Sequence, residues 1–317
     1  MASNLTRSDT AAPLNQRSIW SYLRRDWMFY AMMVPGIIYF LTFKYWPIYG
    51  VSFAFRDYNI FTGAAPWMGT EAFERLFSLP GFWRAFRNNV IISFAKLIFG
   101  FPAPIILSLL INEVAHRQYK KLVQTSVLLP SFISWVIIGG LMLAILSPNS
   151  GVLQAALEWF GYRGRIVNLM ASKEHFRGVI VATYVWRQWG VGTIIYLAAI
   201  ASIDPQLYEA ATIDGAGRWR QLFSITLPSL RLTIIILLIL RVGDLMEAGF
   251  EQIFAIYNPL VYEVAEIIDT YVYKVGLIDR NFSLATAAGL FKSVIGLVMV
   301  LGANWVAKRI DRESGLI

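Results

Sequence analysis

The sequence predicts an all-α membrane protein with six transmembrane helices. Of its 317 residues, 57% are hydrophobic and only 15% are charged, and the mean hydropathy of +0.54 lies far from that of soluble domains. The apolar residues gather in six stretches, each at least as long as the roughly 20 residues that a bilayer core requires. Aromatic residues make up 15% of the chain, which suits a protein with two membrane interfaces.

The composition also excludes several kinds of site. Because the chain has no cysteine, it has no disulfide, thiolate nucleophile, zinc–thiolate site or iron–sulfur cluster. A net charge of +8 would suit nucleic-acid binding in a soluble domain, but these basic residues are scattered between apolar stretches and form no stripe. We therefore expect this chain to contact a lipid bilayer and no nucleic acid.

The first apolar stretch follows a polar segment, residues 1–26, that lacks a clear small-residue cleavage site. We interpret residues 1–26 as a cytoplasmic N-terminal tail and the stretch after it as an uncleaved span, not a signal peptide. Prolines and glycines inside the later stretches are compatible with bundled membrane helices, because neighbouring helices satisfy the freed backbone groups. The expected spans are residues 27–55, 89–110, 122–146, 179–201, 232–255 and 285–306.

The distribution of Lys and Arg predicts that both termini are cytoplasmic. In that orientation thirteen Lys and Arg residues lie on the cytoplasmic side and ten on the other side. The external segments 56–88, 147–176 and 256–283 are long enough to contain short interfacial helices. Within them, apolar residues in segment 151–160 recur with a helical period, which fits either a helix on the membrane surface or ordinary loop packing.

The connection between the fourth and fifth spans carries clear helix signals. Asp204 is a good N-cap and Pro205 suits the first helical position, so a short helix is expected to follow. A turn at Gly215 then leads into a second short helix, which Pro228 is expected to end. From its residues alone, this helix pair with an exposed Glu209 fits either the groove of a partner or the surface of its own bundle.

This segment, residues 202–230, resembles the EAA loop of the permeases of binding-protein-dependent ABC importers, which docks on the ATPase. The residues expected to couple this chain to an ATPase are Glu209, Ala210, Ala211, Asp214, Gly215, Ala216, Leu227 and Pro228. Segment 70–89 resembles the segment that leads into the second span in the sugar-importer branch of this family. Segment 27–63 is similar to the subgroup that imports complex oligosaccharides and polysaccharides, including alginate and pectin fragments. The resemblance covers essentially the whole chain beyond about residue 20.

The resemblance implies a type I ABC importer permease fold, with residues 27–317 forming a six-span permease domain in the bacterial cytoplasmic (inner) membrane. The implied partners are a second homologous permease, with which the chain forms a heterodimer, an ATPase dimer, and an extracytoplasmic solute-binding protein that delivers an oligosaccharide. The chain lacks the G-x-x-x-x-G-K-[ST] phosphate loop. We therefore expect ATP and magnesium to bind the partner ATPase, and this chain to hold no cofactor, metal site or catalytic residue.

Charged residues within the expected spans are the second set of candidates, because a charge in a membrane is costly unless it is paired or hydrated. Four of them recur every three or four residues in the fifth span and should share one helix face, with an internal Arg241–Asp244 ion pair as the competing explanation. The cations suit an acidic oligosaccharide, but the carboxylates can neutralise most of them. The residues expected to line a translocation pathway are Arg187, Arg241, Asp244, Glu247, Glu251, Lys96 and Lys292; Lys44 is also embedded.

Two alternatives belong to other classes. An ion-gradient-driven secondary transporter or channel would also fit six spans with buried charges, but it would not need the EAA-like helix pair. A membrane enzyme is disfavoured, because the chain has neither an H-E-x-x-H nor a G-x-S-x-G motif. Its two histidines, His116 and His175, are expected in loops on opposite sides of the membrane.

Overall fold

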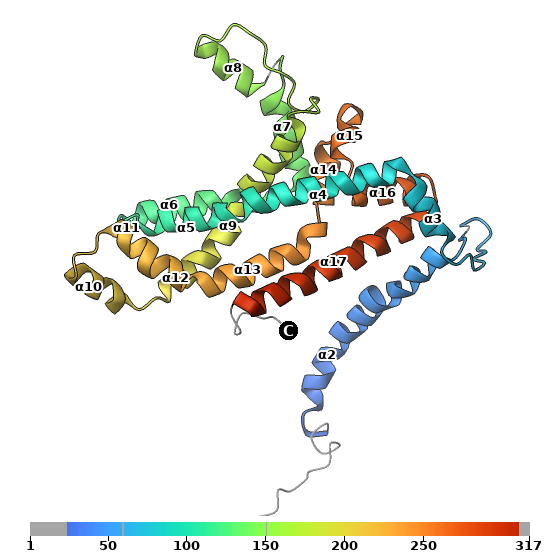
Figure 1. Cartoon of the computed structure of the whole chain (residues 1–317), viewed down its shortest axis with the longest axis horizontal. Coiled ribbons are helices and arrows are strands. Elements are labelled where there is room, and N and C mark those ends of the chain that lie inside the picture. The colour runs from blue at the N-terminus through green and yellow to red at the C-terminus, as the bar shows by residue number, and fades with distance from the viewer. Residues whose placement is uncertain (1–23, 59, 150, 311–317) are drawn as a thin grey trace, which may run out of the picture. The chain divides into compact units, whose positions relative to one another are not determined.

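The computed structural model describes residues 24–58, 60–149 and 151–310, which fold as helices joined by turns. Among these residues the only β-structure is an isolated bridge between Arg56 and Trp67. The chain divides into two compact units, Met1–Ser52 and Phe53–Ile317, and each is described by itself (Figure 1). Most of the expected N-terminal tail and the end of the chain lie outside the described residues, so the cytoplasmic position of the termini stays a prediction.

The first unit is built from one long apolar helix. It comprises α2 (Trp27–Phe40), a π-helical segment η1 (Leu41–Tyr45) and most of a 3₁₀-helical segment η2 (Trp46–Phe55). Together they make a continuous helix over Trp27–Phe55, as the sequence predicted. Pro35 lies inside α2 without ending it, and none of the α2 side chains is buried. An apolar helix with exposed side chains is what a lipid-facing span requires.

The second unit contains all remaining helices, many of them short. Those before the connection between the fourth and fifth expected spans are α3 (Glu71–Ser78), α4 (Pro80–Gly100), α5 (Pro102–Asn112), α6 (Arg117–Leu128), η3 (Leu129–Phe132), α7 (Trp135–Leu146), α8 (Val152–Trp159) and α9 (Phe176–Ala201). Those from this connection onward are α10 (Pro205–Ile213), α11 (Arg218–Gln221), η4 (Leu222–Thr226), α12 (Leu227–Ser229), α13 (Arg231–Gly243), η5 (Asp244–Met246), α14 (Phe250–Ile256), η6 (Pro259–Val261), α15 (Tyr262–Ala265), α16 (Ile268–Tyr273), η7 (Lys274–Ile278) and α17 (Phe282–Ile310).

Three helices of the described chain are long and apolar enough to cross a membrane alone: Trp27–Phe55, Pro80–Asn112 and Phe282–Val306. Three further pairs of helices qualify if each bent pair counts as one span, which gives up to six. The chain is therefore a multi-pass membrane protein. The prediction of six spans agrees with the upper count, and the individual spans remain predictions.

The third expected span, residues 122–146, is not one straight helix. Its two halves, Arg117–Phe132 and Trp135–Leu146, meet at an angle of 103°. Ile133 is extended between them, and the Ser134 hydroxyl accepts a hydrogen bond from the backbone of the new helix and caps it. The apolar composition hides this break, because Ser134 is a weak signal within a hydrophobic run.

The second expected span, residues 89–110, begins earlier than its apolar residues suggest. The helix begins at Pro80, which occupies its first turn, and it includes two buried asparagines. Asn88 donates hydrogen bonds to the carbonyls of Glu263 and Glu266, both at 3.0 Å, so this buried polar side chain before the apolar stretch finds partners inside the fold.

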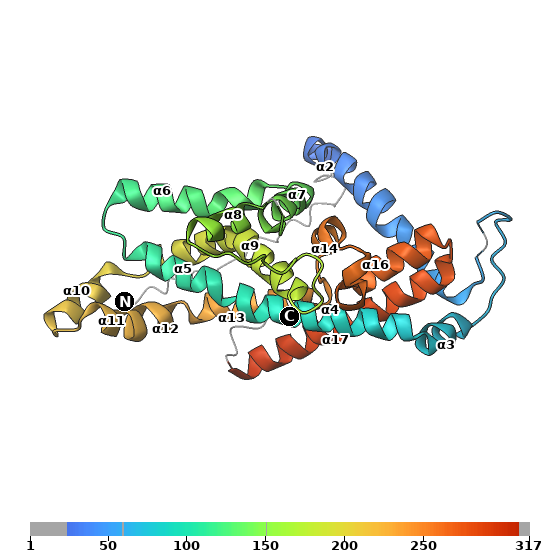
Figure 2. The same cartoon turned by 90° about the horizontal axis from the view of Figure 1, so that it is seen from above.

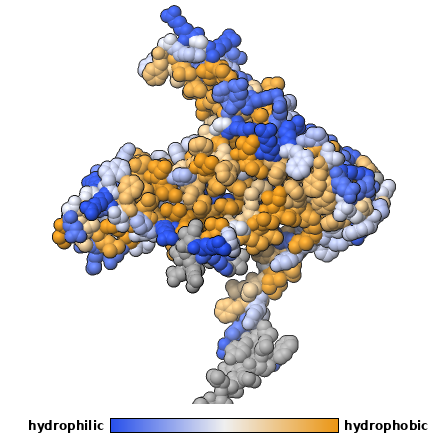
Figure 3. Space-filling model, in the orientation of Figure 1, coloured by the Kyte–Doolittle hydropathy of each residue, from blue (hydrophilic) through white to orange (hydrophobic). Residues whose placement is uncertain are grey.

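Two hydrophobic cores hold the second unit together. Leu76, Phe82 and Tyr271 belong to the first core, which joins α3, α4, α16 and α17. Ile180 and Ile253 belong to the second, which joins α4, α9 and α14 to the segments around α15. In both views, α10 to α12 lie at one end of this unit and α3 at the other (Figures 1 and 2). Apolar side chains cover the middle and hydrophilic ones gather towards both ends (Figure 3), as expected of a bundle that spans a bilayer.

Candidate functional site

A cavity of about 370 Å³ lies inside the second unit, with walls from α4, α7, α9 and the junction between α13 and α14. Its lining residues are Ser93, Lys96, Leu97, Trp135, Tyr184, Gln188, Arg241, Asp244, Leu245, Glu247 and Gly249. The structure therefore brings together four of the seven predicted pathway residues, Lys96, Arg241, Asp244 and Glu247. Arg187, Glu251 and Lys292 are not among the lining residues.

Lys96 is buried, and neutral acceptors surround its ammonium. The Nζ atom donates to the Ala248 carbonyl and to Gln252 Oε1, each at 2.6 Å, and lies 4.7 Å from the centre of the Tyr184 ring. Gln252 in turn donates to the Ile180 carbonyl and the Thr183 hydroxyl. In the described part of the chain Lys96 forms no ion pair, so its positive charge is solvated by dipoles and a π face rather than neutralised.

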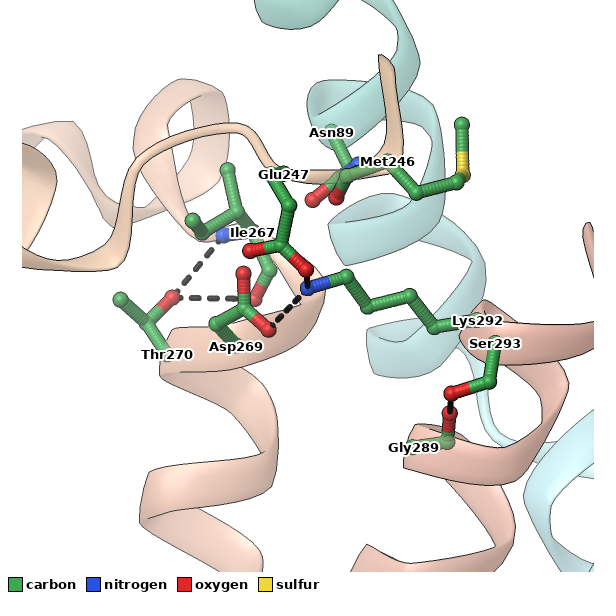
Figure 4. Close-up of polar contacts among 9 residues, drawn as sticks. All are labelled: Asn89, Met246, Glu247, Ile267, Asp269, Thr270, Gly289, Lys292 and Ser293. Atoms are coloured by element: carbon green, nitrogen blue, oxygen red, sulfur yellow. Dashed lines mark hydrogen bonds and ion pairs between the residues drawn. The ribbon is translucent and has the colours of Figure 1, made fainter. Parts of the chain in front are cut away.

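Lys292 has the opposite surroundings, because two carboxylates share its ammonium. Figure 4 shows Lys292 reaching from α17 towards Glu247, after η5, and Asp269, on α16; the Nζ–oxygen distances are 2.9 and 2.6 Å. The Lys292 side chain is 11% exposed and that of Asp269 22%, whereas that of Glu247 is 67% exposed. Nearby, Asn89 donates to the Met246 carbonyl and holds η5 against α4. One buried charge thus ties three segments together.

Arg241 and Arg187 each bind neutral groups. Arg241 donates from Nη1 to the Tyr184 hydroxyl at 3.1 Å, and the described residues contain no Arg241–Asp244 ion pair. Arg187 donates from Nε to the Ile133 carbonyl at 3.0 Å, and its guanidinium lies 4.6 Å from the centre of the Trp135 ring. Arg187 therefore holds the bend before α7 against α9, next to the cavity wall.

The expectation that four charges share one face of the fifth span is wrong. The helix ends at Gly243, and η5 continues to Met246; the chain then turns through Glu247 and Gly249 before α14 begins. Gly249 has φ +92°, in the left-handed region that favours glycine. This break gathers Arg241, Asp244 and Glu247 around the cavity and carries Glu251 beyond it, onto the exposed side of α14.

The helix pair of residues 202–230 forms largely as predicted. The Asp204 side chain caps α10 by accepting from the backbone of Gln206 at 2.9 Å, and Gly215 turns the chain with φ +76°. The second helix, Arg218–Ser229, does not end at Pro228: it passes through a π-helical segment and bends by 56° after Ser229. The π-helical segment, η4, shifts the register of the backbone hydrogen bonds. Pro228 lies just beyond η4 and has no backbone N–H to donate, so a shifted register at this point is expected.

The tip of this helix pair is exposed. Glu209, Ala210, Asp214 and Gly215 are exposed, and the apolar Ile213 is 86% exposed. The remaining predicted coupling residues are Ala211, Ala216 and Leu227, which are half-buried, and the exposed Pro228. Gln221 braces the pair by donating to the Thr212 hydroxyl and the Ala216 carbonyl, both at 3.0 Å. The pair is therefore held in shape from within, while its apolar tip faces outward.

Sequence reasoning missed the polar residues that serve the embedded charges. Gln252 and Thr183 support Lys96, and Asp269 pairs with Lys292 from a segment that was expected to be external. Earlier in that segment, the exposed Glu263 accepts a hydrogen bond from Lys173 of the external segment 147–176, which lowers the pKa of the Glu263 carboxyl. A buried lysine in a span demands acceptors, but only the fold shows which distant residues supply them.

The comparisons with known proteins establish the family. The chain belongs to the binding-protein-dependent transport system inner membrane components, whose family model matches residues 79–312. It is 45% identical over 287 residues to the polygalacturonan/rhamnogalacturonan transport system permease protein YteP of Bacillus subtilis (strain 168), covering 90% of this chain and 89% of YteP. The predicted resemblance is therefore confirmed.

Solved structures of a transporter give the same result. A chain in the crystal structure of a bacterial ABC transporter involved in import of the acidic polysaccharide alginate has a TM-score of 0.85 and 44% identity, covering 92% of this chain and 99% of that one. The alginate ABC transporter in complex with alginate pentasaccharide-bound periplasmic protein matches with the same TM-score and identity, covering 93% and 98%. The all-helical type I ABC permease fold is thus confirmed, and the chain is an ABC transporter permease.

Proposed function

We propose that this chain is one of two permease subunits of an ATP-driven importer of acidic oligosaccharides or polysaccharides in the bacterial inner membrane. A second, homologous permease forms the other half of the pathway, an ATPase dimer binds ATP and magnesium, and a solute-binding protein delivers the sugar. The observation that carries the proposal is the near full-length identity of 44–45% to a permease named for polygalacturonan and to an alginate importer. Both of those substrates are chains of sugar acids.

The two features of the second unit fit the two tasks of such a subunit. The exposed helix pair at one end supplies a rigid tip for an ATPase, with Glu209 available for a charge-assisted contact. The polar cavity supplies hydroxyl, amide and charged groups for a hydrated sugar in an otherwise apolar bundle. Two cations and two carboxylates line it, so its charges balance. The preference for acidic sugars therefore rests on the relatives, and the cavity accounts for the passage of a polar molecule.

The test is reconstitution of the chain with the second permease, the ATPase pair and the binding protein in liposomes. We expect ATP hydrolysis and uptake to rise when the binding protein is loaded with uronic-acid oligosaccharides, and to respond less to neutral ones of equal length. Uptake that follows an ion gradient without ATP would contradict the importer. Equal stimulation by neutral and acidic sugars would contradict the substrate class alone.

A further inference from the structure

Five aromatic side chains form a continuous row outside the polar cavity. The row consists of Phe250, Phe254, Tyr257, Tyr262 and Tyr273, and we call it the aromatic track. The ring centres of Phe250 and Phe254 lie 5.1 Å apart, those of Phe254 and Tyr257 5.9 Å, and those of Tyr257 and Tyr262 4.8 Å. Tyr273 on α16 flanks the row, 5.0 Å from Phe254 and 5.9 Å from Phe250. The helical spacing of α14 places Phe250 and Phe254 on one face.

The aromatic track follows a cavity-lining residue in sequence. Gly249 lines the cavity, and Phe250 is the next residue along the chain. From there the track follows α14 towards α15, two helices that lie away from α10 to α12 in Figure 1. None of the five rings is fully buried, and Phe254 is 42% exposed. Four of the rings are half-buried and Phe254 is exposed, so the row lies at the surface of this unit rather than in either hydrophobic core.

Polar groups accompany the rings. Glu251 lies one residue after Phe250 and three before Phe254, so its exposed carboxylate borders the face that carries both rings. The Tyr257 and Tyr262 hydroxyls add donors and acceptors at the far end. Burial, followed by neighbouring Tyr262 and Glu266, raises the pKa of Tyr257 to about 12, so this hydroxyl keeps its proton at physiological pH. Flat apolar rings with hydroxyls and a carboxylate at their edges match a pyranose, which has apolar faces and a polar rim.

We infer that the aromatic track binds the sugar rings of the transported chain by stacking and leads them, one ring after another, to the polar cavity. This inference rests on the proposed function, because it takes the oligosaccharide as the occupant. Stacking suits a chain in transit, since every sugar ring presents the same kind of face and moves between equivalent positions without breaking a fixed set of hydrogen bonds. Glu251, which the helix break removes from the cavity, then accepts hydrogen bonds from sugar hydroxyls beside the track.

The first experiment uses the reconstituted complex and oligosaccharides of increasing length. Phe254→Leu keeps apolar volume but removes the ring, and Phe254→Tyr keeps the ring. If one stacking contact is worth as much as an aromatic pair, uptake of the longest oligosaccharide should fall about 2- to 10-fold in Phe254→Leu and recover in Phe254→Tyr. The shortest sugar should be affected least. The matched control is Phe94→Leu, which changes a similarly exposed phenylalanine of α4 outside the track.

A second experiment measures contact directly and does not depend on transport. The chain has no cysteine, so Phe254→Cys introduces a unique thiol. Its reaction with a water-soluble maleimide should slow when oligosaccharide-loaded binding protein engages the complex, whereas the thiol of Phe94→Cys should react at an unchanged rate. Wild-type stimulation by loaded binding protein tests the proposed function separately. Suppose that loaded binding protein stimulates ATP hydrolysis by the wild type, so that the proposed function holds. If the Phe254→Cys thiol then reacts at the same rate with and without oligosaccharide, and Phe254→Leu lowers uptake of short and long sugars equally, the aromatic track is overturned and the proposed function is not.

Discussion

Gly249 combines two constraints on the junction between η5 and α14. Its φ of +92° is strained for any residue with a side chain, and an added Cβ would lie 3.0 Å from Lys96 Nζ. The glycine therefore lets the chain leave the fifth span and lets the Lys96 ammonium approach the Ala248 carbonyl closely. The break that separates Glu251 from the cavity and the position of the buried lysine depend on the same residue.

We predict that Gly249→Ala destabilises the protein by about 1–3 kcal/mol, because the left-handed backbone becomes strained and Lys96 must shift. Thermal unfolding of the purified complex in detergent measures the effect as a lower Tm. Gly302→Ala is the matched control: this glycine lies in α17, has no positive φ, and an added Cβ would meet no atom within 4 Å. Equal Tm values for the two variants would show that the junction does not require glycine.

At the scale of the element, the helix pair α10 to α12 was predictable because its signals are local. Asp204, Pro205 and Gly215 act within a few residues of themselves, through capping, a fixed φ and a left-handed turn. Local apolar composition also indicated the membrane helices. It did not indicate where they begin, because polar residues such as Asn88 extend α4 beyond its apolar stretch. The cytoplasmic position of the helix pair remains a prediction.

The breaks inside the spans could not be predicted in the same way. A single glycine or serine in an apolar run rarely decides whether a membrane helix continues, because the neighbouring helices determine whether freed backbone groups find partners. The break after Met246 depends on Asn89 of α4 and Lys292 of α17, both remote in sequence. The charges do recur at a helical spacing in the sequence, but the chain from Arg241 to Glu251 is not one straight helix.

We predict that Glu209→Lys and Gly215→Arg leave membrane insertion and assembly intact and lower ATP-driven uptake about tenfold or more. This loss corresponds to one charge-assisted contact on the ATPase, which Glu209→Lys reverses. Gly215→Arg obstructs the same contact sterically and also strains the turn, because Gly215 has φ +76°. Copurification of the four-subunit complex measures assembly, and uptake into liposomes measures coupling. Glu174→Lys introduces the same charge change at an exposed site elsewhere. Wild-type uptake by both α10-region variants would exclude docking through this turn.

At the scale of the whole molecule, the orientation in the membrane determines which end meets the ATPase. The excess of Lys and Arg predicts that segment 112–121 and the α10 to α12 helix pair lie on the cytoplasmic side, and segment 147–176 on the other. Because the structure puts Glu113 near Arg218, at 4.0 Å, these two predicted cytoplasmic connections lie side by side. The fold thus agrees with the expectation that they share one membrane surface.

We predict that single cysteines at two exposed positions label from opposite sides. Gln118→Cys should react with an impermeant maleimide only after the cytoplasmic face is opened, and Glu174→Cys should react in intact spheroplasts. The cysteine-free wild type is the background control. Labelling of Glu174→Cys from the cytoplasmic face alone would reverse the topology and move the aromatic track to the wrong side for incoming sugar.

The exposed apolar side chains of the helix pair also have a consequence for the abundance of this subunit relative to its partners. Ile213 and Trp219 are 86% and 75% exposed, at an end of the molecule that lipid does not cover in the predicted topology. If the proposed ATPase covers this tip, a copy synthesised in excess of the ATPase would present these side chains to the cytosol, where exposed apolar surface attracts chaperones and proteases. We therefore expect the scarcest partner to limit its steady-state abundance, so that a higher gene dosage of the permease alone adds turnover rather than transporters.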